Sequence, residues 1–310
     1  MEKFDIIGIG DADVDILVSV PHLPSYDEKV KGKILGQYPG GIISNFLCAA
    51  SRFGARCAAV VRTGDDERGK ISLEDLRAHG VDTSHCICYP GTSTYFTLSC
   101  VDASGEKSMV VCLDGSTQPE ISDLPMEFLS QASYVHMIGT YADAVLAVGR
   151  ECRKRGVRLS IDIERQEWQI PQEKIREILS LTYIAFPNER GLAYISGKDS
   201  VEEGCAWMLR QGCRIVAATL GAKGVYVCTE KETFTFPAFR VDVRDTTGAG
   251  DTFNAAFLSC LSKGYDLQAC ARLATAASAL QIQQIGARGG MPQEKDARQF
   301  LLARGVCPET

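Results

Sequence analysis

The chain has 310 residues, 45% of them hydrophobic, which is enough for the core of one large α/β domain. Its formal net charge of -6, with no block of Lys or Arg, argues against a broad basic surface for nucleic acid. Its 13 cysteines form no C-x-x-C pair and its 4 histidines show no metal spacing, so reduced structural thiols are expected.

The first predicted strand covers residues 4–10 and is apolar, as buried parallel strands are. Acids flank this short run at once, so we expect neither a signal peptide nor a membrane span, and a cytoplasmic location. Strands alternating with helices predict a parallel sheet with helices on both faces and ligands at the carboxyl ends of the strands. Further strands are predicted at 58–64, 132–139, 158–163, 183–188 and 214–221. Helices are predicted at 43–55, 66–81, 142–157, 171–181, after 188, and from 267 to about 284, with a last helix ending near Gly305.

Two segments, 15–38 and 92–115, break this alternation and contain no good helical pattern. The second has strand-like runs around residues 103–106, which is a hairpin signal. We expect both segments to form a small antiparallel sheet beside the main one, within a single domain over residues 1–310. The apolar alternation of 95–101 could not be buried by a two-stranded flap alone, so a homodimer through this sheet is expected.

The stretch DTTGAGDTF, residues 245–253, carries the clearest chemistry. A glycine-rich turn that opens a helix presents free backbone N–H groups, and the helix dipole adds partial positive charge, so an anion site is predicted. The stretch is not a Walker A sequence, because no G-K-[ST] follows. Asp251 falls in the first turn of the helix. A carboxylate there is either a helix cap or, beside a phosphoryl group, the acceptor of a hydroxyl proton.

This stretch closely resembles the C-terminal signature of the ribokinase, or PfkB, family of carbohydrate kinases. Residues 40–55 resemble the N-terminal signature of that family, and 62–69 and 219–225 resemble later segments in the same order. The resemblance covers essentially the whole chain. It implies a three-layer, doubly wound α/β fold with a mostly parallel central sheet, and a small β-sheet lid built from 15–38 and 92–115.

The resemblance also implies a role for each matching residue. The expected catalytic residues are the base Asp251 and the anion hole Gly248, Ala249 and Gly250. The expected ATP-site residues are Asn188, Thr219, Gly221 and Gly224, with Mg²⁺ as the cofactor. The expected sugar-binding residues are Asp13, Asp15, Gly41 and Asn45, since carboxylates and amides suit polyol hydroxyls. For the nucleotide and sugar positions the alternatives are a tight turn and a solvated turn, and Asp11 is expected in such a solvated turn.

Asp245 and Thr247 match positions that in many members bind a monovalent cation, such as K⁺; the alternative is a capped turn without an ion. Many members also carry Asn-x-x-Glu, tied to Mg²⁺ and phosphate, before the nucleotide loop. Here Asn188 matches, but Gly191 stands at the glutamate position and Glu189 comes two residues early. Arg165 resembles an arginine that binds the substrate in some relatives, although its spacing is one residue short. The two alternatives are that it binds an anionic group on the sugar and that it is a surface arginine.

The predicted function is an ATP-dependent kinase of a sugar or sugar-like polyol, of the ketose, ribose or acid-sugar type. A nucleoside kinase of the same family remains an alternative. A non-catalytic sugar- or nucleotide-binding regulator is a second alternative, against which the intact Asp251 and its glycines argue. A dehydrogenase is excluded, because GIGDAD at residues 8–13 lacks the third glycine of G-x-G-x-x-G.

Overall fold

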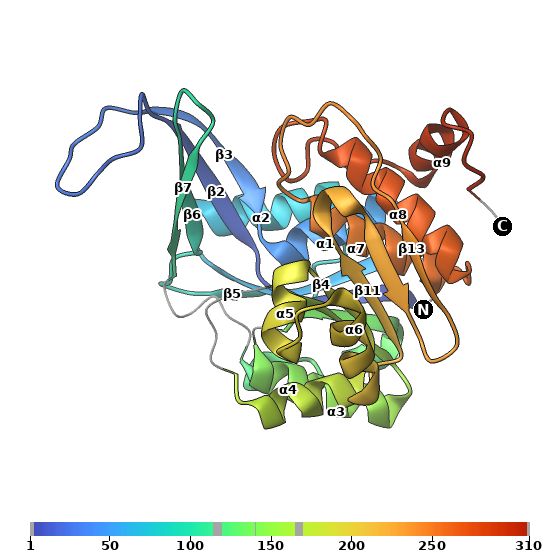
Figure 1. Ribbon diagram of the computed structural model, residues 1–310. Helices are drawn as coiled ribbons and strands as arrows, with labels where there is room; N and C mark the ends of the chain where they lie inside the picture. The colour runs from blue at the N-terminus through green and yellow to red at the C-terminus, as the bar shows by residue number, and fades with distance from the viewer. Residues whose placement is uncertain (1–2, 114–119, 140, 165–169, 309–310) are drawn as a thin grey trace.

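The computed structural model describes residues 3–113, 120–139, 141–164 and 170–308, and Figure 1 shows how their elements are arranged. Within these residues the central sheet consists of β1 (Phe4–Gly10), β4 (Cys57–Gly64), β5 (Ile87–Tyr89), β8 (Ala132–Ile138), β9 (Arg158–Ile163), β10 (Thr182–Pro187), β11 (Ile215–Thr219), β12 (Val225–Cys228) and β13 (Thr233–Phe236). Their order is β13-β12-β11-β10-β9-β8-β1-β4-β5. The pairs from β11 to β5 are parallel, and β12 and β13 add an antiparallel edge.

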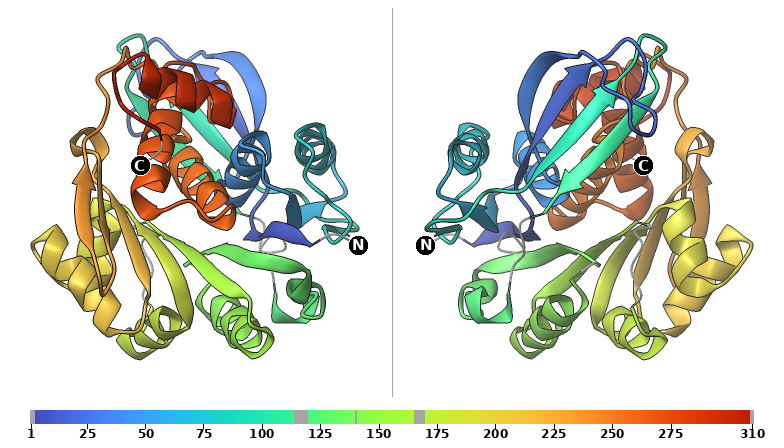
Figure 2. Two further views of the ribbon diagram at one scale, coloured as in Figure 1. Left: turned by 90° about the vertical axis from the view of Figure 1, so that its right-hand side faces the viewer. Right: turned by 90° about the vertical axis from the view of Figure 1, so that its left-hand side faces the viewer.

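Helices cover both faces of this sheet, as Figure 2 shows. One face carries α1 (Ile42–Arg52), α2 (Glu67–Ala78), α7 (Ala249–Ser262), α8 (Leu267–Gln281) and α9 (Glu294–Leu302). The other face carries α3 (Ala142–Arg155), α4 (Gln172–Leu181), α5 (Glu189–Ser196) and α6 (Val201–Arg210). Successive strand residues point to opposite faces, so Ile6 packs into the first core and Ile7 into the second. This is the three-layer arrangement that the sequence predicts.

A second sheet, the lid sheet, is formed by β2 (Asp13–Ser19), β3 (Lys33–Gly40), β6 (Phe96–Val101) and β7 (Lys107–Cys112) in the order β3-β2-β6-β7. The two outer pairs are antiparallel, but the central pair of β2 and β6 is parallel, which corrects the expectation of an all-antiparallel sheet. The cause is the connection: β2 and β6 belong to different segments, and the chain crosses the main sheet between them. The predicted hairpin turn is present, with Gly105 at φ 87°.

Two features differ from the sequence expectations. The edge strands β12 and β13 were not expected as a pair, and α8 ends at Gln281 rather than near Gln284. The chain turns there because the buried Gln281 amide donates to the carbonyls of Thr247 and Gly286, at 3.2 and 2.8 Å. As expected from the sequence, the cysteines are all free thiols. Among the described residues, no helix is both long enough and apolar enough to cross a membrane.

Candidate active site

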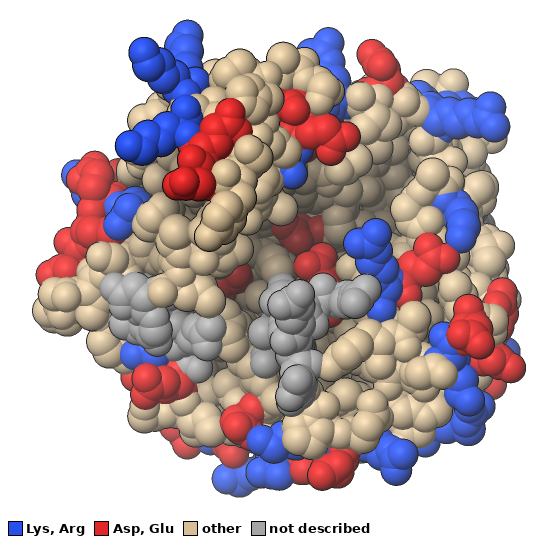
Figure 3. Space-filling model, turned by 60° about the vertical axis from the view of Figure 1, so that its left-hand side comes forward, with Lys and Arg blue, Asp and Glu red and all other residues tan. Residues whose placement is uncertain are grey.

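The candidate active site lies where the carboxyl end of β1, the lid sheet and the N-termini of α1 and α7 come together. The fold places it there because ligands of parallel α/β sheets bind beyond the carboxyl ends of the strands. Figure 3 shows a hollow on this face of the molecule, with acidic side chains in its floor.

Asp251 lies in the first turn of α7 and is only 8% exposed to solvent. The N-cap position belongs to Gly248 and has no side-chain cap, so the structure does not support the capping alternative for Asp251. Burial raises the pKa of this carboxyl to about 7; the hydrogen bond from Asn45 opposes the rise, the charges of Glu164 and Asp11 add to it, and that of Arg288 opposes it. A carboxyl with this pKa exchanges its proton near neutral pH.

Asn45 of α1 holds the Asp251 carboxylate, and Arg288 decides how Asn45 is oriented. The Asn45 amide donates from Nδ2 to Asp251 Oδ2 over 2.9 Å, while its Oδ1 accepts from Arg288 Nε over 2.8 Å. A guanidinium only donates hydrogen bonds, so it requires the amide oxygen on its own side and leaves the amide N–H groups for Asp251. The sequence analysis missed Arg288. The signal was a single charged residue inside the glycine-rich turn at 285–290.

Arg288 is held by two further groups. Its Nη2 donates to the carbonyl of Gly40 over 2.8 Å, and its Nη1 forms an ion pair with Asp75 of α2. Asp75 also lies 3.3 Å from Nδ1 of His79. Burial works against ionisation of Asp75, but His79 and the charge of Arg288 hold its pKa below the usual value, and Asp75 raises the pKa of His79 to about 10. The arginine therefore joins α1, α2 and β3 behind the base.

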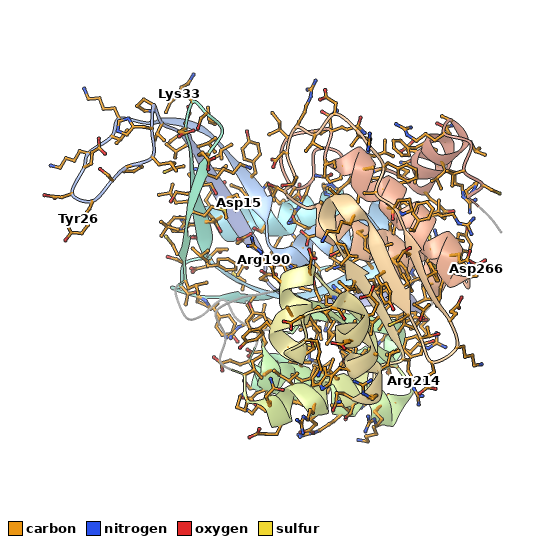
Figure 4. All side chains as sticks on the ribbon, viewed as in Figure 1. Asp15, Tyr26, Lys33, Arg190, Arg214 and Asp266 are labelled. Atoms are coloured by element: carbon orange, nitrogen blue, oxygen red, sulfur yellow. The ribbon has the colours of Figure 1, made fainter. Side chains whose placement is uncertain are left out.

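On the sugar side, Asp13 and Asp15 of β2 lie against the glycine pair that precedes α1. Asp13 is 5% exposed, and its Oδ1 has no hydrogen-bond partner among the described residues. Burial raises the pKa of Asp13, and the charges of Asp11 and Asp15 add to the rise. A Cβ atom on Gly40 would lie 2.3 Å from Asp13 Oδ1, and Gly41 has φ 91°. Figure 4 shows Asp15 where the lid sheet joins the rest of the molecule. The structure thus brings Asp13, Asp15, Gly41 and Asn45 together.

Asp11 does not lie in a solvated turn, which corrects the sequence expectation. It is 6% exposed, its Oδ1 accepts from the backbone N–H of Ile43 over 3.0 Å, and its Oδ2 accepts from the hydroxyl of Tyr95 over 2.7 Å. The carboxylate holds the N-terminus of α1, where backbone N–H groups lack partners within the helix. A turn directly after a strand looks solvated in sequence, because the residue that covers Asp11, Tyr95, is 84 positions away.

The predicted anion hole forms the start of α7. Gly248 has φ 75°, and a Cβ atom there would lie 2.4 Å from the carbonyl oxygen of Ala287, so only glycine fits. Around Gly250, by contrast, an added Cβ would meet no atom within 4 Å, so the space beside the loop is open. The first N–H groups of a helix point into such a space and attract anions.

Asp245, at the start of the same loop, has a full set of donors. Its Oδ1 accepts from Thr247 N and Oγ1 over 3.1 and 2.7 Å and from Lys107 Nζ over 3.1 Å, and its Oδ2 accepts from Gly286 N over 2.9 Å. Burial opposes ionisation, but these bonds hold the pKa of Asp245 at about 2. The bonds to Thr247 match the capped-turn alternative. Lys107 Nζ stands beside the carboxylate at which a monovalent cation was expected, and the binding of such an ion there stays a prediction.

The predicted nucleotide residues come together at the ends of β10 and β11. Asn188 caps α5 by accepting from Gly191 N over 2.7 Å, and it pairs with Thr219. A Cβ atom on Gly191 would lie 2.2 Å from the carbonyl of Ile163, so the glutamate of many relatives cannot fit here. Glu189 points elsewhere, in an ion pair with Lys223. Gly221 and Gly224 follow in a turn with positive φ. Arg165 lies outside the described residues.

Two acids at the carboxyl end of β9 were also missed. Asp162 is 4% exposed and its Oδ2 accepts from Asn254 of α7 over 3.1 Å, and Glu164 follows two residues later. Burial raises the pKa of both carboxyls. Their signal in the sequence was the acid pair that ends a buried strand, the position where ligand groups gather in such sheets.

Comparisons with known proteins show what the chain as a whole is similar to. The model of the pfkB family carbohydrate kinases matches residues 3–294. The ribokinase of Bacillus subtilis is 30% identical over 302 residues, which is 96% of this chain and 99% of that protein. The 2-dehydro-3-deoxygluconokinase of Thermoproteus tenax is 29% identical, over 86% of each chain. Among solved structures, the Arabidopsis thaliana ribokinase complexed with ribose and ATP superposes with a TM-score of 0.86 at 25% identity, over 97% of this chain and 99% of that one. The predicted fold class is confirmed.

Proposed function

The chain belongs to the pfkB family of carbohydrate kinases, and we propose that it transfers the γ-phosphoryl group of ATP to a hydroxyl of a sugar or sugar-like polyol. One observation carries this assignment: Asp251 is a buried carboxyl with a pKa of about 7, placed beside a glycine loop at a helix N-terminus. Such a group takes the proton of the attacking hydroxyl while backbone N–H groups stabilise the phosphoryl group.

Asp251 acts as the base in this proposal. Asn45 holds Oδ2, so we assign Oδ1 to the substrate hydroxyl. The carboxylate must be ionised to accept a proton, so turnover should rise with pH through about 7. The N–H groups of Gly248, Ala249 and Gly250 then face the developing negative charge, and they need no lysine because the helix dipole adds to them.

The nucleotide lies along Asn188, Thr219, Gly221 and Gly224 in this proposal. The acids at the end of β9 suit Mg²⁺, because Asp162 and Glu164 offer hard oxygen ligands and a dication would favour their ionised forms, which burial disfavours. Asp162 and Glu164 would provide carboxylate ligands in this chain, where Gly191 leaves no room for a glutamate. Bound Mg²⁺ would neutralise charge on the transferred phosphate.

Asp13 and Asp15 bind the sugar in this proposal. Their carboxylates accept hydrogen bonds from hydroxyls, and Asp13 Oδ1 lacks a partner that a hydroxyl would provide. Alanine at either position should raise KM for the sugar and leave ATP affinity nearly unchanged, as steady-state kinetics with each substrate varied would measure. A large rise in KM for ATP with an unchanged KM for the sugar would contradict the assignment.

The lid sheet closes the single domain over the sugar and, we propose, pairs with a second copy. Apolar side chains on its outer strands are exposed to an unusual degree, including Ile34 at 65%, Leu35 at 48%, Met109 at 66% and Val110 at 56%. Sedimentation at micromolar concentration should show a dimer, and a charge on the exposed apolar surface of β7, Met109→Lys, should shift it to monomer. A monomer alone in the unmodified protein would contradict the proposal.

The proposed function as a whole is tested with a substrate panel. ADP release should be measured with ketoses, aldopentoses, acid sugars and nucleosides, each with ATP and Mg²⁺. A sugar or polyol that stimulates ADP release by far the most supports the proposal, whereas selective stimulation by nucleosides would support the nucleoside-kinase alternative. If no acceptor in the panel stimulated ADP release and a sugar still bound tightly, the result would point to the non-catalytic regulator.

A further inference from the structure

An ion pair joins the lid sheet to the glycine loop, although its residues are 138 positions apart. Lys107 is the first residue of β7, next to the hairpin turn of the lid, and its Nζ lies 3.1 Å from Oδ1 of Asp245. Asp245 begins the loop that leads into Gly248 and α7. Figure 2 shows the tip of the lid and this loop at the same end of the molecule.

The position of Lys107 is distinctive because the other donors to Asp245 are neutral. Thr247 donates through its backbone N–H and its hydroxyl, and Gly286 donates through its backbone N–H. Asp245 is therefore the point where the glycine loop and the turn after α8 are tied together. Its side chain is 11% exposed, so its negative charge has lost most of its water, and an adjacent cation offsets that loss.

Lys107 also faces the sugar side of the site. Burial raises the pKa of Asp15, and the charge of Lys107 is among those that oppose the rise. The Lys107 side chain thus runs from the lid sheet to Asp245, at the start of the loop that would hold the phosphoryl group.

We propose that Lys107 is a tethered monovalent cation. When the lid is closed, its ammonium occupies the position beside Asp245 that a cation from solution would otherwise take, and it thereby couples closure of the lid to ordering of the glycine loop. The inference rests on the proposed kinase function, since the ordered loop is the anion hole of that reaction. Lys107 is a positioning residue in this account, and it makes added K⁺ unnecessary in the unmodified protein.

The effect should appear in loop geometry and turnover rather than in overall stability. Lys107 is 43% exposed, and ion pairs with an exposed partner contribute little to the free energy of folding. A small displacement of a phosphate-binding loop, in contrast, reduces turnover strongly, because the reacting atoms must be held in line.

The test is rescue by a free cation. Turnover should be measured for the unmodified protein and for Lys107→Met in tetramethylammonium, sodium and potassium chloride at equal ionic strength. The unmodified protein should vary by no more than about twofold, whereas Lys107→Met should lose about tenfold in tetramethylammonium and recover most of it in potassium. Independently of activity, potassium should raise the thermal midpoint of Lys107→Met but not that of the unmodified protein, because only the variant binds the ion.

Matched variants complete the experiment. Lys107→Arg keeps the charge and should behave as the unmodified protein, and Lys33→Met removes a lysine from the outer end of β3 on the same sheet (Figure 4) and should change neither measurement. Adding Asp245→Asn to Lys107→Met should abolish the rescue. Equal potassium activation of the unmodified protein, a loss in Lys107→Met that no cation restores, or unchanged turnover of Lys107→Met in tetramethylammonium would each overturn the inference. If no acceptor in the panel were phosphorylated, the thermal measurement would still test Lys107.

Discussion

Replacing Asp251 with asparagine should reduce turnover by roughly 10²–10⁴, the usual scale for removing a positioned base. Asparagine has nearly the same shape but cannot accept the proton of the attacking hydroxyl. ATP binding should persist, because the backbone N–H groups of residues 248–250 are unchanged and a negative neighbour is gone. Steady-state kinetics at saturating substrates and calorimetric titration with ATP measure the two effects separately.

The same substitution should leave the fold intact. Burial raises the pKa of Asp251 to about 7 in the folded protein, above the value of about 3.9 expected in the unfolded chain. The folded state therefore binds more protons between these values, and the carboxylate lowers stability as pH rises through that window. Asparagine removes this contribution, so the thermal midpoint of the variant at pH 8 should equal or exceed that of the unmodified protein.

Two outcomes would contradict the role assigned to Asp251. Turnover of Asp251→Asn within a few-fold of the unmodified protein would remove it as the base. A marked fall in thermal midpoint would show instead that the carboxylate is needed for the fold, and the loss of turnover would then carry no information about proton transfer.

Replacing Arg288 with methionine should reduce turnover by about 10²-fold, because a misplacement of about 1 Å at the reacting groups has an effect of that size. Asn45 would lose the donor that orients its amide. Its side chain could then rotate and lose the hydrogen bond that positions the Asp251 carboxylate. Arg288 is also a positive charge that lowers the pKa of Asp251. Its removal should therefore move the acid limb of the turnover–pH profile to higher pH.

Arg288→Lys separates the two contributions of the arginine. Lysine keeps the positive charge, so the acid limb should stay near its original pH, but a single ammonium cannot reach Asn45, Gly40 and Asp75 in the fixed geometry of a guanidinium, so turnover should remain low. If Arg288 only stabilised the fold, both variants would lower the thermal midpoint and leave the acid limb unchanged. Loss of the Asp75 ion pair makes a measurement of thermal midpoint necessary in either case.

Much of the site was predictable because its residues lie in short contiguous motifs. The stretch at 245–253 carries the base and the anion hole together, and the pair at 40–41 precedes the helix that bears Asn45. The sequence also predicted that Asp13 and Asp15 follow the first strand, and the structure places them beside Gly40. Asp11 was wrongly expected in solvent, since its burial depends on Tyr95, which arrives from the lid.

By itself, the sequence determined the α/β class, the family and the sugar-kinase activity, which the family match confirms. The α/β class follows from local periodicity, and the family and the activity follow from the resemblance of short contiguous motifs to those of the family. Only the tertiary structure decided that Arg288 orients Asn45 and that Lys107 reaches Asp245, pairs that are 243 and 138 positions apart. No local pattern states which side chains meet across such distances, because the packing of helices and of the lid brings them together.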